Sequence, residues 1–73
     1  MDTREAESLV YKYMAKHDLP DEWLFRWQNK KRSLGTCSYK KKEIRLSKWY
    51  VELNHLISVR DTILHEIAHA LSY

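Results

Sequence analysis

The residues most able to do chemistry stand near the end of the chain, where His65, Glu66 and His69 form the pattern H-E-x-x-H. On a helix, two histidines four residues apart project from one face, so their ring nitrogens can reach a single metal ion. Glu66 would point about 100° away from His65 and about 60° away from His69, which suits its carboxylate to a water molecule beside the metal rather than to the metal itself. The pattern therefore indicates metal-assisted hydrolysis.

The residues around this motif favour a helix that begins near Val59. Ser58 and Asp61 have the spacing of a capping box, in which a serine hydroxyl and an acidic side chain cap free backbone N–H groups. The histidines fall outside the predicted core face, but they could also be two solvated side chains on an amphipathic helix. The predicted apolar side consists of Val59, Ile63, Leu64, Ile67, Ala68, Ala70 and Leu71, and the polar side of Ser58, Asp61, Thr62, His65, Glu66, His69 and Ser72.

The composition is that of one small foldable domain. The 73 residues are 44% hydrophobic and 32% charged, and they include three tryptophans and five tyrosines. A single cysteine excludes an internal disulfide framework. No apolar run reaches membrane-spanning length and no signal-peptide core precedes the first helix, so we expect a cytoplasmic monomer without membrane contact. The net charge of +3 only hints at an anionic partner.

The order of predicted elements indicates an α+β fold with an N-terminal helix, an antiparallel or mixed sheet of about three strands, a short helix and the motif helix. Pro20 follows the first helix, because proline cannot continue one. Trp23, Phe25 and Trp27 alternate as in a strand that turns its aromatic face to the core, although aromatics in register could also stack bases. The predicted ranges are 3–17 for the first helix, 23–27, 33–39 and 43–46 for the strands, and 48–53 for the short helix, which Ser47 would cap.

Four further residues could have special roles. Gly35, the only glycine, marks a bulge or a close approach of another backbone. Cys37 could offer a thiolate to zinc, although an isolated cysteine in a strand is usually a small buried hydrophobe. His17 is a ligand only in principle, and His55 would reach the motif only if its linker folded back. For both histidines, a solvated side chain is the simpler interpretation.

Three segments together give the chain a likeness to a known family. They are Leu34-Gly35-Thr36-Cys37, Ile44-Arg45-Leu46-Ser47 and the motif segment from Asp61 to Leu71. In these segments the sequence resembles the SprT-like family of zinc metallopeptidases, which is related to the Spartan protease, and the sibling YgjP-like and WLM groups share a similar pattern. The resemblance covers residues 32–72 and implies a zincin-like fold.

The resemblance also implies roles for the motif residues. His65 and His69 would bind Zn²⁺, and Glu66 would act as general base toward a zinc-activated water in peptide-bond hydrolysis. The substrate would be a protein or peptide, extended along an edge strand between Ser33 and Leu46. A further downstream histidine completes the site in such families, and catalytic zinc usually has three protein ligands. We therefore expect residues 1–73 to be an incomplete piece of a single metallopeptidase domain, with its third ligand beyond residue 73 and little activity alone.

Basic residues gather in the middle third of the sequence. Clustered basic charge beside aromatics is an electrostatic footprint for nucleic acid. Members of the family that the chain resembles degrade proteins crosslinked to DNA, which adds DNA as a candidate partner. Solvated lysines in turns explain the same residues, and a non-catalytic nucleic-acid- or protein-binding module with a metallopeptidase-like fold is the alternative hypothesis. The candidate nucleic-acid contacts are Lys30, Lys31, Arg32, Lys40, Lys41 and Lys42.

Overall fold

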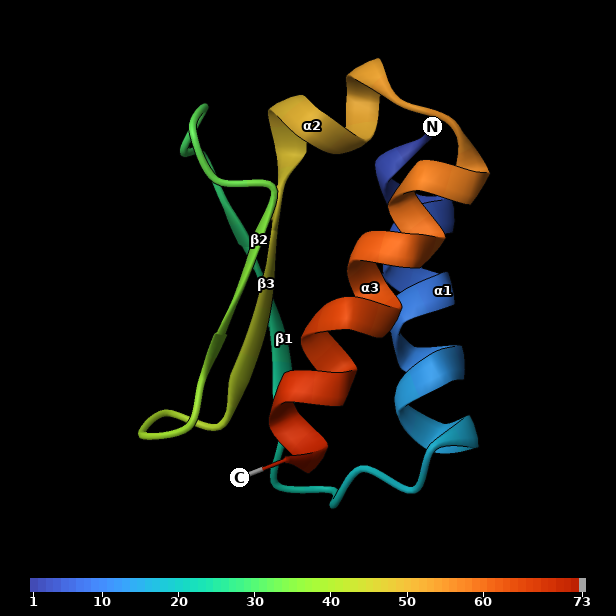
Figure 1. Ribbon diagram of the computed structural model, residues 1–73. Helices are drawn as coiled ribbons and strands as arrows, with labels where there is room; N and C mark the ends of the chain where they lie inside the picture. Colours follow the sequence, from blue (N-terminus) through green and yellow to red (C-terminus); the bar gives the residue numbers. More distant parts are fainter. Residues whose placement is uncertain (73) are drawn as a thin grey trace.

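A three-stranded sheet packs against a pair of helices in the computed structural model, which describes residues 1–72 (Figure 1). Helices α1 and α3 lie side by side on one face of the sheet, and α2 connects the sheet to α3. The described part of the chain thus confirms the predicted α+β class and the mixed sheet. The elements are α1 (Thr3–Lys16), β1 (Leu24–Gln28), β2 (Gly35–Ser38), β3 (Glu43–Ser47), α2 (Lys48–Leu53) and α3 (Leu56–Leu71).

Strand β3 is the centre of the sheet, whose order is β1-β3-β2. It pairs in parallel with β1, where Phe25 lies opposite Ile44, and antiparallel with β2, where Cys37 lies opposite Ile44. Residues directly opposite each other on neighbouring strands point to the same face of a sheet. Phe25, Ile44 and Cys37 therefore share the face that the helices cover. Strand β2 is left at one edge of the sheet, beside α3.

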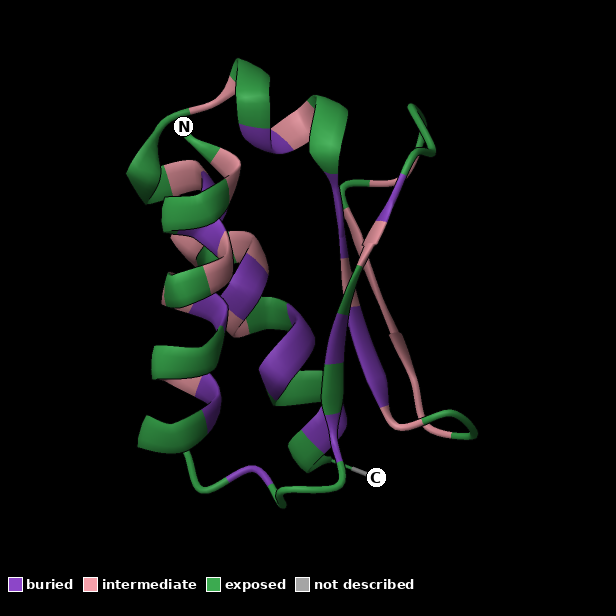
Figure 2. Cartoon of the chain, turned by 180° about the vertical axis from the view of Figure 1, so that it is seen from behind, coloured by how far each residue is buried: buried purple, intermediate pink, exposed green. Residues whose placement is uncertain are grey.

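The core lies between the helices and the sheet, where buried residues face one another from both layers (Figure 2). The alternation predicted for the first strand is confirmed, because Trp23 and Phe25 are buried and Trp27 packs against the core. Among residues 1–72, none of the helices combines the length and apolar character needed to cross a bilayer. The largest fully buried side chains of the two main layers are Val10, Ile44, Leu46, Val59, Ile63 and Ile67.

Helix α3 begins earlier than the capping-box spacing predicts. It starts at Leu56, with His55 at the N-cap position and no side-chain hydrogen bond there. Ser58 lies inside the helix, where its carbonyl oxygen accepts a hydrogen bond from the Tyr50 hydroxyl at 2.8 Å. The predicted cap at Ser58 is wrong because the His55 carbonyl oxygen already accepts the first helical bond, from the amide of Val59 at 3.0 Å.

The side of α3 that faces the core differs from the predicted one. Leu64 is only half-buried, and Ala68 and Leu71 are exposed, although all three belong to the predicted apolar side. Glu66, predicted on the polar side, is 7% exposed. The neighbouring elements decide which residues of α3 are buried. The helix packs between α1 and the β2–β3 half of the sheet rather than against a broad surface. Its buried residues are Val59, Ile63, Glu66, Ile67 and Ala70.

Gly35 allows α3 to lie close to β2. A methyl group at this position would stand 3.0 Å from the Arg45 carbonyl oxygen and 3.2 Å from the Leu46 Cδ2 and Thr62 Cγ2 atoms. The first of these atoms belongs to the backbone of β3, which cannot move without breaking the sheet. The predicted close approach of another backbone at Gly35 is therefore confirmed.

The face of the sheet away from the helices carries an ion network centred on Glu43. Its carboxylate accepts hydrogen bonds from Arg45 Nη2 at 2.8 Å and from Arg26 Nε at 3.2 Å. The hydrogen bond from Arg45 is the largest cause that holds the pKa of Glu43 below its usual range, against the opposing effect of burial. The two arginines thus stabilise the ionised carboxylate on the central strand.

We expect Gly35→Ala to destabilise the fold by about 1–3 kcal/mol, because the added methyl group overpacks the contact between β2, β3 and α3. The free energy of unfolding in urea measures the effect. Thr62→Ser removes one of the three crowding atoms and keeps the hydroxyl, so the double variant should recover part of the loss. Full stability of Gly35→Ala alone would contradict the close approach.

The Glu43 network should make stability depend on acid pH. Because the folded-state pKa of Glu43 is lowered, its contribution is complete above the unfolded-state pKa of about 4.3 and disappears as the pH falls through the folded-state pKa. Glu43→Gln should therefore be less stable than wild type at pH 7, and the difference should shrink at pH 3. Urea unfolding at the two pH values measures this, and a difference independent of pH would refute it.

Candidate metal centre

His65 and His69 bring their Nε2 atoms to within 3.1 Å of each other on the exposed side of α3. Their ring centroids lie 4.5 Å apart and the ring planes are nearly perpendicular, at 87°. The four-residue spacing on a continuous helix produces this arrangement, because residues four apart are neighbours on the helix surface. The two histidines therefore present two nitrogen atoms toward one point outside the helix.

This pair of nitrogen atoms fits a zinc ion. Two histidine ligands of a tetrahedral zinc, each at about 2.0–2.1 Å, stand about 3.3 Å apart. The observed 3.1 Å is close to that separation. Imidazole nitrogen is also a ligand type that zinc prefers. Without a metal, the same distance permits one Nε2–H group to donate a hydrogen bond to the other ring.

Glu66 lies between the two histidines in sequence but turns toward the sheet. Glu66 is only 7% exposed, so its side chain lies on the inner side of α3, and its negative charge raises the pKa of the Cys37 thiol of β2. Within residues 1–72 the carboxylate has no hydrogen bond or ion pair. Neither oxygen atom of the carboxylate is completely buried, so both keep contact with solvent. Within the described part of the chain, hydrogen bonds and ion pairs therefore leave the lone pairs of the Glu66 oxygens unoccupied.

Cys37 is half-buried on the helix-facing side of β2. Burial is the main cause that raises the pKa of its thiol, and the charge of Glu66 raises it further. Both effects favour the protonated thiol over the thiolate that binds zinc. Cys37 thus acts as a small packing side chain here, in line with the simpler interpretation of its position.

Among residues 1–72, the other two histidines do not join the pair as a group that could hold a metal ion. His17 follows α1 and stacks on Tyr13, with ring centroids 6.3 Å apart. His55 is the N-cap residue of α3, ten residues before His65, which corresponds to about 15 Å along the helix axis. Among residues 1–72 no group of three His, Cys, Asp or Glu side chains is close enough to hold a metal ion. The described residues thus offer two candidate protein ligands, His65 and His69.

Tyr39 is a residue of this region that sequence reasoning did not single out. Its hydroxyl donates a hydrogen bond to the backbone carbonyl oxygen of His69, thirty residues away in sequence. The only sequence signal is general, since a partly buried tyrosine usually finds a partner for its hydroxyl. The sequence does not indicate which partner that is.

The six candidate nucleic-acid contacts fall into two groups at opposite ends of the sheet (Figure 1). Residues 30–32 lie between β1 and β2, whereas residues 40–42 form the turn between β2 and β3. The length of β3, about 17 Å for five residues, separates the two groups. Lys31 lies over the Trp49 ring, 4.7 Å from its centroid, and Lys42 forms an ion pair with Glu22 at 2.8 Å. The two groups therefore do not form one patch.

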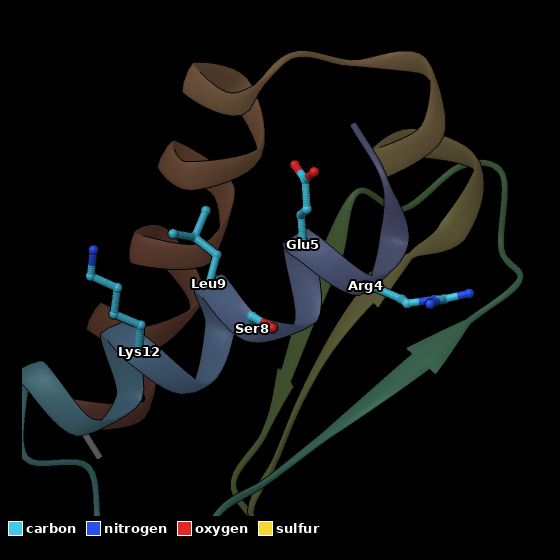
Figure 3. Close-up of a pocket in the computed structure, with 5 residues that line it drawn as sticks. All are labelled: Arg4, Glu5, Ser8, Leu9 and Lys12. Atoms are coloured by element: carbon cyan, nitrogen blue, oxygen red, sulfur yellow. The ribbon is translucent and has the colours of Figure 1, made fainter.

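Two surface depressions help to delimit the site. One is a shallow hollow on the outer side of α1 that contains none of the motif residues (Figure 3). The other, of about 450 Å³, lies at the C-terminal end of α3 and includes Tyr39 and Ala70, beside the turn that carries His69. The first hollow is lined by Arg4, Glu5, Ser8, Leu9 and Lys12.

Comparison with known proteins supports one family. A sequence model of the SprT-like family matches residues 6–73, which is nearly the whole chain and includes the strands and the motif helix. Neither the curated proteins nor the solved structures gave a match. Because the family match spans both the sheet and the paired histidines, the chain belongs to the SprT-like family.

Proposed function

We propose that this protein is a zinc-dependent metallopeptidase domain in which His65 and His69 hold the metal and Glu66 is the general base. The observation that carries the proposal is the 3.1 Å separation of the two Nε2 atoms. The Glu66 carboxylate, which has no hydrogen bond or ion pair among residues 1–72, lies one residue along the same helix and adds to it. Membership of the SprT-like family points to the same class of activity.

Each residue of the motif has a separate task in this proposal. A zinc ion would supply a Lewis acid for the peptide carbonyl and would acidify a water molecule. Glu66 would accept the proton of that water and return it to the leaving amine, which its free oxygen lone pairs allow. The histidines keep their Nε2 lone pairs for the metal when their hydrogens are on Nδ1. A third ligand would come from water, substrate or residues outside 1–72.

The edge strand β2 would hold the substrate. It has β3 on one side only, so its other edge can pair with an extended peptide chain. Because α3 packs beside β2, a peptide on this edge would lie next to the helix that carries the motif. Backbone hydrogen bonds to β2 would bind many sequences, since they do not depend on side chains.

A zinc titration followed at the imidazole resonances of the four histidines tests the metal pair. We expect saturable shifts confined to His65 and His69. His69→Ala should lower the affinity by at least about tenfold, because it removes one of two described ligands. His55→Ala is the matched control and should leave the affinity unchanged. Absence of a saturable response in the wild-type chain would refute the proposed function.

Glu66→Gln separates metal binding from catalysis. The variant should bind zinc as the wild type does, because Glu66 is not a ligand in this proposal. Any rate of peptide hydrolysis should fall by about 10²–10⁴-fold, the usual contribution of a general base. Hydrolysis of an internally quenched peptide measures the rate. Cleavage by Glu66→Gln at the wild-type rate would exclude Glu66 as the base.

A second candidate function is nucleic-acid binding at one end of the sheet. Trp49 is 48% exposed, and Lys31 lies over its ring. Lys30 and Arg32 flank Lys31 in the same loop. An exposed aromatic ring beside several cations is the usual combination for single-stranded nucleic acid, where bases stack and phosphates pair with the cations. The group at residues 40–42 lies in the hairpin turn at the other end of the sheet, away from Trp49.

Two triple alanine variants of equal charge test this second candidate. Replacement of Lys30, Lys31 and Arg32 should weaken binding of a thymidine oligonucleotide by at least about tenfold and reduce its salt dependence. Replacement of Lys40, Lys41 and Lys42 removes the same charge and should have a much smaller effect. Fluorescence anisotropy at several salt concentrations measures both. Equal effects would mean that only net charge matters, which would rule out a specific site.

A further inference from the structure

Tyr39 ties the end of the sheet to the last turn of α3. It follows β2 directly, and its hydroxyl donates a hydrogen bond to the His69 carbonyl oxygen. Its ring packs edge-on against Trp23, with centroids 6.4 Å apart and planes at 89°. The Tyr39 carbonyl oxygen also accepts the amide of Lys42 at 3.3 Å, which closes the turn between β2 and β3. Tyr39 is thus held at its ring and at its backbone while its hydroxyl reaches the helix.

Within residues 1–72, the last turn of α3 is otherwise held by the buried Ala70 and by hydrogen bonds at its own end. The final carbonyl groups of a helix lack the amide four residues later, and helix ends fray for that reason. Here the amide of Ser72 is shared between the carbonyl oxygens of Ala68 and His69, at 3.1 and 3.2 Å. The Ser72 hydroxyl donates to Ala68 as well, at 2.8 Å. These bonds all come from α3 and its own C-cap residue, whereas the bond from Tyr39 comes from the sheet.

We propose that Tyr39 is a positioning residue for the metal pair, which rests on the proposed zinc site at His65 and His69. His65 lies one turn further into the helix, so fraying of the last turn moves His69 alone. Such movement changes the separation of the two Nε2 atoms, which is 3.1 Å when the turn is closed. Zinc needs both nitrogens at once, so the hydroxyl of Tyr39 raises the fraction of molecules that are ready to bind.

The size of the effect follows from the strength of one hydrogen bond. Loss of a single hydrogen bond changes an equilibrium by about 2- to 10-fold. The apparent affinity for a ligand falls in proportion to the fraction of the competent form. We therefore expect Tyr39→Phe, which keeps the ring on Trp23, to weaken zinc binding by about 2- to 10-fold.

Tyr50 of α2 offers a matched control, because its hydroxyl also bonds a carbonyl group of α3. Its hydroxyl donates to the carbonyl oxygen of Ser58 at 2.8 Å and lies 2.9 Å from the Thr62 hydroxyl. Tyr50→Phe therefore also removes a tyrosine hydroxyl that bonds a carbonyl of α3. Ser58 is seven residues before His65, about 10 Å along the helix axis. Tyr50→Phe should therefore lower the free energy of unfolding without moving His69.

The experiment compares wild type, Tyr39→Phe and Tyr50→Phe by zinc titration at the histidine resonances, by urea unfolding and by amide hydrogen exchange. Support for the role of Tyr39 requires weaker zinc binding and faster exchange in the last turn of α3 for Tyr39→Phe alone. Tyr50→Phe should keep zinc affinity within about twofold, even if it unfolds as easily, because its lost bond lies outside the last turn. The exchange measurement distinguishes local fraying from a general loss of stability.

Two results would overturn this role. Unchanged zinc affinity in Tyr39→Phe would exclude it, and so would an equal loss in both variants, since that would reflect stability alone. Failure of the wild-type chain to bind zinc would instead refute the proposed metal site itself. The two failures can therefore be told apart in the same set of titrations.

Discussion

The close packing of α3 against β2 is the contact on which the rest of the structure depends. It is possible because Gly35 has no side chain, so that Thr62 of the helix and the backbone of β3 can lie next to β2. Ile63 and Ile67 are then almost fully buried in the core. This packing fixes the rotation of α3 about its axis, and the rotation decides which residues of the motif face solvent and which face the sheet.

The motif residues are separated by that rotation. His65 and His69 are exposed and their nitrogens converge outside the helix, whereas Glu66 is buried against the sheet side and acts on Cys37. A carboxylate in such a place has few competing partners and limited solvent, which are favourable conditions for a general base. In the proposed function, the same packing would provide both the open side that binds the metal and the more enclosed side that carries the general base.

Helix α3 is also held near both ends by tyrosine hydroxyls from other parts of the chain. Tyr50 from α2 bonds its first turns and Tyr39 from the end of β2 bonds its last turn. The core fixes the middle of the helix through apolar contacts, which resist rotation but are not directional. Hydrogen bonds to the carbonyl groups add direction at the ends, where the helix cannot satisfy its own backbone.

The sequence by itself determined the local features of this protein. Apolar spacing located the elements, the alternation at Trp23 and Phe25 identified the inner face of the first strand, and Ser47 marked the cap of α2, because these signals act between residues near in sequence. The spacing of His65 and His69 likewise implied their proximity. Only the tertiary structure decided that β3 is the central strand, that Glu66 is buried, that Tyr39 meets His69 and that the basic residues lie in two groups. Those features arise from contacts between residues far apart in the chain, which no local pattern encodes.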